Sequence, residues 1–431
     1  MLNKINIGML GMGTVGTGVL KILNSNANNI ECKVGEPVHI KKVLVRDRSK
    51  VRGITTDAQI TTDINDIISD PDIQIVVEVM GGEVPAKDYI LAALNAGKHV
   101  VTANKDVVAR YGRELFAAAK QNHVDLLFEA SVGGGIPIIR PLKQCLAANR
   151  IHEVMGIVNG TTNFMLTKMT KERMEFEKIL AEAQAKGYAE ADPTADIGGW
   201  DAARKAAILA SLAFNTRVTL ADVYVEGITH ISLQDIDYAT ELGYVVKLLA
   251  VAKEDENGVN VRVHPAFIPA THPLAAVSDV YNAIYVKGDA VGETMFYGRG
   301  AGEMPTASAV SADIIDVARD IHHGVSSRIL CTCYEDKKIT SVDQTESPYY
   351  LRLLVDDKPG VLAAIASAFG AQQVSLHSVI QKRKVAGCAE VVLITYRVSH
   401  ANLKLASKTL EGMSVVNKVS SIIRVEAEAI E

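Results

Sequence analysis

A glycine-rich turn close to the N-terminus constrains the fold of this chain more than any other feature. A short apolar run at residues 5–10 is followed by GMGTVG at residues 11–16 and then by apolar residues at helical spacing. The order strand, glycine turn, helix is the context in which a GxGxxG sequence binds a dinucleotide. Gly11 would form the tight turn, Gly13 would let backbone amides approach a pyrophosphate, and Gly16 would let the helix pack on the sheet. The turn therefore predicts a Rossmann-type domain with phosphates at the N-terminus of its first helix.

The end of the second predicted strand, residues 38–45, bears on the choice of cofactor. An acid at this position usually binds the ribose hydroxyls of NAD, whereas an arginine suits the 2′-phosphate of NADP. Arg46 stands at this position and further cations follow it. Asp47 comes one residue later and keeps NAD as an alternative. We therefore predict NADP, while a charged surface turn without a binding role is the other interpretation of this segment.

Strand-like and helical segments go on alternating beyond the second strand. They lie at residues 73–79, 89–95, 98–102, 113–121 and 124–129. Such alternation predicts a parallel sheet with helices on both faces, which binds its ligands at the carboxyl ends of the strands. Lys105 follows one of these strands, so we expect its side chain to meet cofactor or substrate. A plain surface lysine is the alternative interpretation.

A second informative segment is GYAEADPTADIGGWDAARK at residues 187–205. Asp201 and Lys205 are four residues apart and share a helix face. The helix that continues after Lys205 is apolar almost all round, which indicates burial. An ordinary helical salt bridge is the alternative, but the acids Glu190 and Asp196 directly precede the pair. Because a desolvated lysine loses proton affinity and can act as a base, the segment predicts a proton-transfer site.

Composition excludes several classes of protein. At 431 residues the chain has room for two to three domains, each with its own core. A net charge of −5 and the absence of a basic patch with aromatic residues disfavour binding to nucleic acid. No apolar run approaches the roughly 20 residues of a membrane span, and no leader precedes the first strand. The five cysteines form no CxxC pair, which favours the reducing cytoplasm, and we predict no metal or redox role for Cys331-Thr-Cys333.

The order of motifs suggests how the domains follow one another. We expect the nucleotide domain at residues 1–135, a substrate domain at 136–304, and a helix at 305–325 that packs back on the nucleotide domain. The polar stretch 335–348 is predicted to be a linker. Residues 349–431 have the βαββαβ order of a ferredoxin-like module. Because this module holds no convergent acid, base or nucleophile, we expect it to sense a ligand or support assembly, and to be removable without loss of chemistry.

Taken together, the motifs resemble homoserine dehydrogenase of the long bacterial type, with a C-terminal ACT domain, over essentially the whole chain. The motifs that carry this resemblance are GMGTVGTGV at 11–19, ANK at 103–105, EASVGGGIP at 129–137, NGTTNFML at 159–166, the segment at 187–205, GAGEMPTAS at 300–308 and DKPGVLA at 357–363. The resemblance implies an α/β fold class: a Rossmann-type nucleotide domain, an α+β catalytic and dimerisation domain, and a ferredoxin-like ACT domain. The implied reaction is the reversible NAD(P)-dependent interconversion of L-homoserine and L-aspartate 4-semialdehyde, in threonine, methionine and isoleucine biosynthesis.

The resemblance also implies roles for single residues. The catalytic residues would be Lys205, Lys105 and Asp201, with Lys205 transferring the proton. The substrate would be bound by Glu190, Gly187, Asp196 and Asp201. The cofactor would contact Gly11, Gly13, Thr14, Val15, Gly16, Arg46, Lys105 and Gly302. A sodium ion would be held by Glu129 and by the carbonyls of Val132, Gly134 and Ile136.

Partners and alternatives follow from the same comparison. The resemblance implies L-threonine as an effector bound by the ACT domain, and a homodimer or homotetramer, with no nucleic acid or membrane as partner. Two other classes stay open on the residues alone, namely a nucleotide or amino-acid sensor without turnover and a different amino-acid or sugar dehydrogenase. A sensor has no need of a proton relay, so the pair Asp201 and Lys205 favours an enzyme.

Overall fold

The N-terminal part of the chain builds a parallel sheet with the strand order β3-β2-β1-β4-β5-β6. The computed structural model describes residues 4–50, 53–329, 331–385 and 387–426. The sheet and its connections comprise β1 (Ile5–Leu10), α1 (Thr14–Ser25), α2 (Ala27–Val34), β2 (Val38–Leu44), β3 (Gln59–Thr61), α3 (Asn65–Ile68), β4 (Ile73–Glu78), α4 (Ala86–Asn95), β5 (His99–Thr102), α5 (Lys105–Gln121) and β6 (Leu126–Leu127). This strand order is the one that binds dinucleotides, so the Rossmann-type prediction is confirmed.

The chain divides into two compact units. The first consists of Met1–Val154, Ala207–Leu220 and Asn282–Asp336. The second consists of Met155–Ala206, Ala221–Tyr281 and Lys337–Glu431. The strand β7 (Ile151–Ile157) and the helix α9 (Trp200–Ala213) contribute residues to both units. Among the residues that the structure describes, no helix is both long enough and apolar enough to cross a bilayer.

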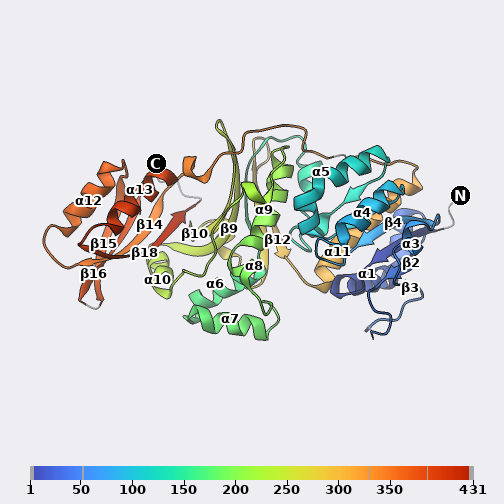
Figure 1. Ribbon diagram of the computed structural model, residues 1–431, viewed down its shortest axis with the longest axis horizontal. Coiled ribbons are helices and arrows are strands. Elements are labelled where there is room, and N and C mark those ends of the chain that lie inside the picture. Colours follow the sequence, from blue (N-terminus) through green and yellow to red (C-terminus); the bar gives the residue numbers. More distant parts are fainter. Residues whose placement is uncertain (1–3, 51–52, 330, 386, 427–431) are drawn as a thin grey trace. The chain divides into compact units, whose positions relative to one another are not determined.

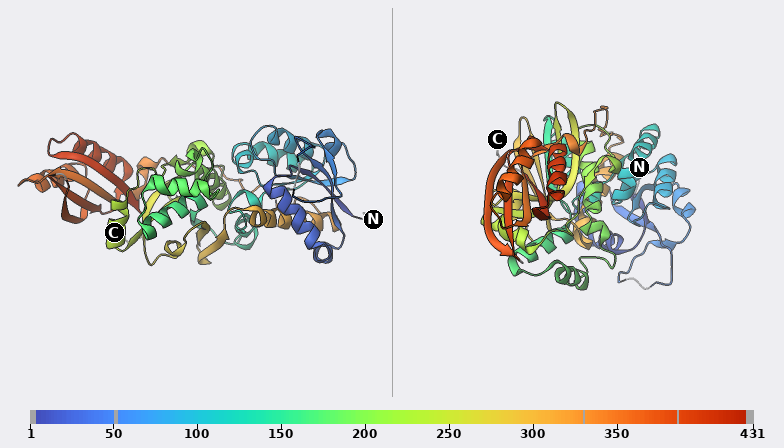
Figure 2. Two further views of the ribbon diagram at one scale, coloured as in Figure 1. Left: turned by 90° about the horizontal axis from the view of Figure 1, so that it is seen from below. Right: turned by 60° about the vertical axis from the view of Figure 1, so that its left-hand side comes forward.

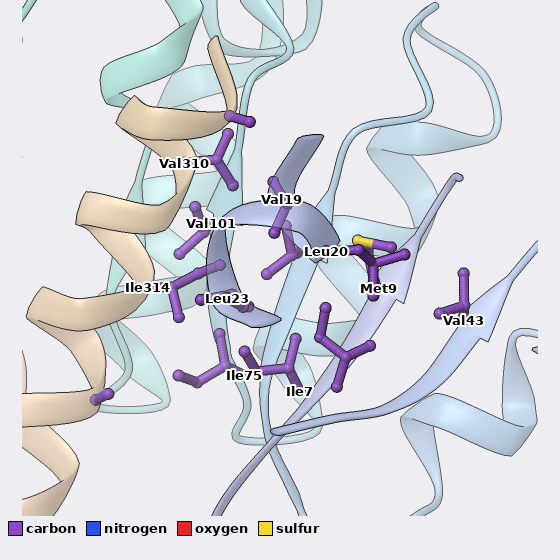
Figure 3. Packing of buried hydrophobic residues seen from close by; sticks show 14 of the residues in the cluster. Ile7, Met9, Val19, Leu20, Leu23, Val43, Ile75, Val101, Val310 and Ile314 are labelled. Atoms are coloured by element: carbon purple, nitrogen blue, oxygen red, sulfur yellow. The ribbon is translucent and has the colours of Figure 1, made fainter. Parts of the chain in front are cut away.

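Two hydrophobic cores cover the two faces of the Rossmann sheet in the first unit. In one of them, Val19 of α1 and Ile7 of β1 lie close to Val310 and Ile314 of α11 (Glu303–His322) (Figure 3). The other core is formed with residues of α4 and α5. The remaining elements that lie wholly or mainly in this unit are η1 (Glu129–Ser131), η2 (Pro141–Cys145), β11 (Tyr281–Gly288) and β12 (Gly292–Arg299), and η3 (Leu220–Asp222) lies at the boundary with the second unit. The close packing of α1 on the sheet fixes the glycine turn that precedes it.

The second unit combines helices with an antiparallel sheet. Its first part contains α6 (Gly160–Glu172), α7 (Phe176–Ala185), α8 (Thr194–Ile197), β8 (Tyr224–Val225), α10 (Leu233–Glu241), β9 (Tyr244–Asp255), β10 (Gly258–Pro269) and η4 (Pro273–Ala276). The strands β9 and β10 pair antiparallel along their whole length, from Gly258 opposite Asp255 to Pro269 opposite Tyr244. Nearly all of β10 is buried, so this hairpin forms the centre of the unit.

The C-terminal residues of the second unit form a βαββαβ module (Figure 1). Its elements are η5 (Val342–Gln344), β13 (Glu346–Ser347), β14 (Tyr349–Asp356), α12 (Val361–Ala371), β15 (Leu376–Val385), β16 (Cys388–Thr395), β17 (Val398–Ser399), α13 (His400–Glu411) and β18 (Val416–Val425). The strand order β18-β14-β16-β15 is antiparallel throughout. The helices α12 and α13 share one hydrophobic core with this sheet. The ribbon of the module has the orange and red colours of the C-terminal residues in Figure 2. The prediction of a ferredoxin-like module is confirmed.

The C-terminal module and the stretch before it form backbone hydrogen bonds with β10. The strand β18 pairs in parallel with β10, with Ala266 opposite Arg424 and Phe267 opposite Val425. In the stretch that precedes the module, Val259 N donates to Lys338 O over 2.9 Å and Thr340 N donates to Val259 O over 2.8 Å. The sheet of the module therefore continues into the β9–β10 hairpin. Removal of the module would expose the edge of β10, so a clean truncation of the kind expected from the sequence is disfavoured.

Candidate functional site

The glycine turn between β1 and α1 has the conformation that phosphate binding requires. Gly11 has a positive φ of 103°, which favours glycine. A Cβ on Gly16 would come within 2.4 Å of the Gly11 carbonyl oxygen, so the helix could not start here with a larger residue. A Cβ on Gly13 would meet no described atom within 4 Å, which leaves the backbone open to a ligand. Among the residues that the structure describes, no side chain caps α1, so its first amides are available to an anion.

Glu78, at the end of β4, organises the loop beside this turn. Its side chain is buried, and its Oε1 accepts from Met80 N over 2.8 Å and from Gly81 N over 3.3 Å. Its Oε2 accepts from Thr102 Oγ1 over 2.6 Å, which ties the ends of β4 and β5 together. Burial raises the pKa of Glu78. From the sequence we noted no role for this residue, although an acid inside an apolar strand was the available signal.

Lys105 begins α5 directly after the carboxyl end of β5. Asn104 caps the helix, because its Oδ1 accepts from Val107 N over 3.2 Å, and its Nδ2 donates to Gly82 O over 2.7 Å. These bonds fix the position of Lys105 at the edge of the sheet where ligands of such folds bind. Arg46, which the sequence predicts to select the cofactor, follows the end of β2, and its side chain is exposed.

Glu129 is buried and its carboxylate binds backbone amides of the segment that leads into η2. Oε1 accepts from Ile138 N over 2.6 Å and from Ile139 N over 2.8 Å, and Oε2 accepts from Arg140 N over 2.8 Å. The Glu129 N–H in turn donates to Asp313 Oδ2 on α11 over 2.8 Å. The structure thus gives Glu129 a helix-capping role that the sequence did not suggest.

The carbonyls of Val132, Gly134 and Ile136, which the family resemblance places in a cation site with Glu129, belong to the loop between η1 and η2. Within the described residues, no backbone amide donates to the carbonyl oxygen of Val132, Gly134 or Ile136. Gly134 has a φ of 55°, and a Cβ there would come within 2.3 Å of Gly300 O. A hard cation takes oxygen ligands of this kind, and a carboxylate that accepts three hydrogen bonds still has a lone pair to offer. The donor set therefore fits a small cation.

In the second unit, Lys205 and Asp201 form a tight pair on α9. Lys205 Nζ lies 2.7 Å from Asp201 Oδ2 and donates a second bond of 2.7 Å to Val158 O. Each of the two side chains is only 13% exposed. Asn159 Nδ2 bridges two acids, since it donates to Asp196 Oδ1 over 2.7 Å and to Asp201 Oδ2 over 2.9 Å. The structure therefore brings Lys205, Asp201 and Asp196 together around an asparagine.

Asn159 is the residue of this cluster that sequence reasoning missed. It caps α6, because its Oδ1 accepts from Thr162 N over 2.8 Å, and it is 5% exposed. An asparagine that precedes a Gly-Thr-Thr helix start was the signal in the sequence. Burial raises the pKa of Asp196, and the neighbouring Asp201 charge adds to this effect. The cluster thus combines a cation, two carboxylates and an amide whose orientation is fixed.

The other two predicted substrate residues lie on the turn after α7. Gly187 has a φ of 71° and follows the helix in the position that glycine favours. Glu190 is exposed, and its backbone oxygen accepts from Gln184 Nε2 over 3.1 Å. The hydrogen bonds of the Asp201–Lys205 cluster do not include Glu190. Gly302, the remaining predicted cofactor residue, has a φ of 119° and precedes α11 in the first unit.

Comparison with known proteins gives consistent matches along the chain. A family described as homoserine dehydrogenase matches residues 137–315, its NAD binding domain matches 11–129, and the ACT domain matches 349–413. The homoserine dehydrogenase of Bacillus subtilis (strain 168) is 46% identical over 429 residues and covers 99% of each chain. The counterpart from Synechocystis sp. is 45% identical and covers 98% of this chain and 99% of its own.

Solved structures agree with these matches. The homoserine dehydrogenase of Thiobacillus denitrificans has a TM-score of 0.94 and 42% identity, with 98% of each chain covered. A hyperthermophilic archaeal homoserine dehydrogenase, solved in complex with NADPH, has a TM-score of 0.63 and 28% identity, and covers 73% of this chain and 97% of its own. These matches cover both the nucleotide-binding domain and the segment that holds Asp201 and Lys205. The chain therefore belongs to the homoserine dehydrogenase family of oxidoreductases, with NAD-binding, catalytic and ACT domains.

Proposed function

We propose that Lys205 transfers the hydroxyl proton in the interconversion of L-homoserine and L-aspartate 4-semialdehyde. The observation that carries this proposal is the bonding of its ammonium group, which donates to Asp201 Oδ2 and to Val158 O, each over 2.7 Å. An ammonium has three N–H donors, so these two bonds leave one N–H for a substrate oxygen. When bound, the nicotinamide cofactor supplies or takes the hydride. During reduction the Lys205 ammonium gives a proton to the substrate oxygen, and during oxidation the neutral Lys205 amine takes the hydroxyl proton.

The acids around Lys205 suit the other end of the substrate. L-Homoserine and the semialdehyde carry an ammonium group, which carboxylates such as Asp201, Asp196 and Glu190 would bind. Asn159 keeps the first two of these carboxylates close together. We assign a backbone contact to Gly187 and a second catalytic lysine to Lys105, on the basis of family resemblance.

Purified protein tests this function directly. Consumption of NADPH should depend on aspartate semialdehyde, and reduction of NADP should depend on L-homoserine. A protein that binds nucleotide but turns over neither substrate would be a sensor. Turnover of a sugar or diamino acid without turnover of homoserine would indicate a different dehydrogenase.

We propose that the protein prefers NADP to NAD and that Arg46 binds the 2′-phosphate of NADP. We expect Arg46→Asp to shift the ratio of kcat/KM for NADPH over NADH by at least about tenfold toward NADH, because it replaces a phosphate-pairing cation with a hydroxyl acceptor. Steady-state kinetics with both cofactors measure the ratio. Arg48→Asp is the matched control in the same exposed turn. An unchanged ratio in Arg46→Asp, with a shift in Arg48→Asp, would assign the phosphate to Arg48.

We further propose a sodium ion as a structural cation at Glu129, Val132, Gly134 and Ile136. The three carbonyls accept no described backbone hydrogen bond, and the Glu129 carboxylate binds the amides of Ile138 and Ile139, which follow them in the chain; these observations support the assignment. The ion would hold the loop between η1 and η2 in place and would take no part in the proton transfer.

The ACT domain should make the enzyme sensitive to L-threonine. We propose the turn that holds Asp357 and Gly360 as the effector site, and pairing of two domains side by side in a homodimer or homotetramer. In support of pairing, β15 has a strand neighbour on one side only within the described chain, and its Val379 is 47% exposed. We also propose a cytoplasmic location, because scattered cysteines without a CxxC pair are typical of proteins in a reducing compartment.

Asp357→Ala should weaken inhibition by threonine by about tenfold or more while turnover without threonine is unchanged. The reason is that a carboxylate in the turn would bind the ammonium group of the effector, and coupling between two sites is typically about 1–3 kcal/mol. Inhibition curves for the two proteins measure the change. Glu411→Ala, at the end of α13, serves as the control. Unaltered inhibition in Asp357→Ala would place the effector elsewhere.

A further inference from the structure

Two cysteines face a cavity in the first unit that the proposed chemistry does not use. The cavity is small, with a volume of about 20 Å³. Cys331, Thr332 and Cys333 form part of its wall, to which Lys143 and Arg217 also contribute. Neither cysteine is exposed in the way that Cys32 and Cys145 are. The cavity therefore places a closely spaced dithiol next to two basic side chains.

The surroundings of Cys331 favour its thiolate. Arg217 Nη2 lies 3.5 Å from Cys331 Sγ. The neighbouring Cys333 thiol, the backbone of Cys333 and the charges of Arg217 and Lys143 outweigh the effect of burial and lower the pKa of Cys331 to about 5. Lys143 Nζ lies 5.6 Å from the centre of the Phe116 ring, in an apolar setting that screens its charge little. An electropositive, partly exposed setting is typical of reactive cysteines.

Cys333 is placed as the resolving thiol. It stands two residues from Cys331 on the same cavity wall, and its Sγ donates to Ser211 O over 3.7 Å. The neighbouring Cys331 and burial raise the pKa of Cys333 and keep it protonated. One thiolate next to one thiol is the arrangement that reacts with a peroxide in two steps.

Although the sequence alone predicts no redox role for these residues, we propose that Cys331 and Cys333 are a peroxide-reactive dithiol that closes to a reversible intramolecular disulfide. In the first step the Cys331 thiolate attacks the terminal oxygen of a hydroperoxide, the O–O bond breaks, and a sulfenic acid forms while the second oxygen leaves as hydroxide or alkoxide, which takes a proton from water. In the second step Cys333 sulfur attacks the sulfenic sulfur, the S–S bond forms, and water leaves with the Cys333 proton. The dithiol loses two electrons and the peroxide gains them. A thiol reductant reverses the process.

Rates of alkylation at two pH values test the proposal without using enzyme activity. At pH 6 a thiol with a pKa near 5 is mostly ionised, whereas an ordinary thiol with a pKa of about 8.5 is ionised to about 0.3%. Lower basicity reduces nucleophilicity with a Brønsted slope of about 0.4–0.5. Iodoacetamide should therefore alkylate Cys331 roughly five- to tenfold faster than Cys32 or Cys145 at pH 6, and more slowly than them at pH 9. Peptide mass spectrometry of the full chain measures each site.

Hydrogen peroxide provides the second part of the test. In the reduced wild-type protein we expect loss of two hydrogen atoms from the peptide that holds both cysteines, reversed by dithiothreitol. Cys333→Ser should leave a sulfenic acid at Cys331 that dimedone traps, and Cys331→Ser should leave Cys333 unmodified. The proposal fails if Cys331 shows no reversal of relative rate between pH 6 and pH 9. It also fails if peroxide produces only disulfides between molecules or oxidation at Cys32 and Cys145.

Discussion

Replacing Lys205 with alanine is expected to lower kcat by roughly 10²–10⁴-fold, the usual contribution of a general acid or base. Lys205 is held between Asp201 Oδ2 and Val158 O, and its side chain is 13% exposed, so bulk water is a poor substitute for its ammonium group. An alanine has high helix propensity, and Lys205 lies inside α9, so the helix should be kept. The loss should therefore appear in turnover rather than in folding.

Turnover of purified Lys205→Ala is measured in both directions, together with binding of NADPH by fluorescence and folding by circular dichroism. Lys178→Ala is a suitable control, because Lys178 is an exposed lysine on α7 of the same unit. Near-normal turnover of Lys205→Ala at neutral pH would show that Lys205 is structural. A variant that loses cofactor binding to the same degree as turnover would also contradict a role in proton transfer.

Arg352→Ala should destabilise the second unit by about 3–5 kcal/mol, the usual cost of leaving buried charges without their partner. Arg352 Nε binds Asp235 Oδ1 over 2.8 Å and Nη1 binds Glu390 Oε2 over 3.2 Å. The two carboxylates belong to residues that are 0% and 2% exposed, so neither can recover its hydration when the arginine is removed. Asp235 is also the N3 residue of the capping box that starts α10, which links the ACT domain to that helix.

Urea unfolding followed by circular dichroism measures this change as a lower midpoint of the transition that reports the second unit. Arg397→Ala is the matched control, since Arg397 is exposed and donates a bond of 3.3 Å to Glu346 O. We expect this control to stay within about 0.5 kcal/mol of the natural protein. If both arginine variants unfold alike, the buried ion pairs do not hold the ACT domain to α10.

The sequence by itself determined the elements whose information is local. The turn GMGTVG after an apolar strand was sufficient for the Rossmann domain, because glycine conformation and helix start are set by neighbouring residues. The spacing of Asp201 and Lys205 was sufficient for a pair on one helix face, since α-helical periodicity is fixed by the backbone. The βαββαβ order of the C-terminal module could be predicted from the sequence for the same reason.

Only the tertiary structure decided which distant residues meet. It placed Asn159 between Asp196 and Asp201, gave the Glu129 carboxylate three backbone amides, and set Cys331 beside Arg217. It also joined β18 to β10, so that the sheet of the C-terminal module continues into the β9–β10 hairpin. Each of these contacts links segments far apart in the chain and depends on strand register and close packing. Such contacts leave no periodic trace in the sequence, because the energy that fixes them comes from burial of many residues at once.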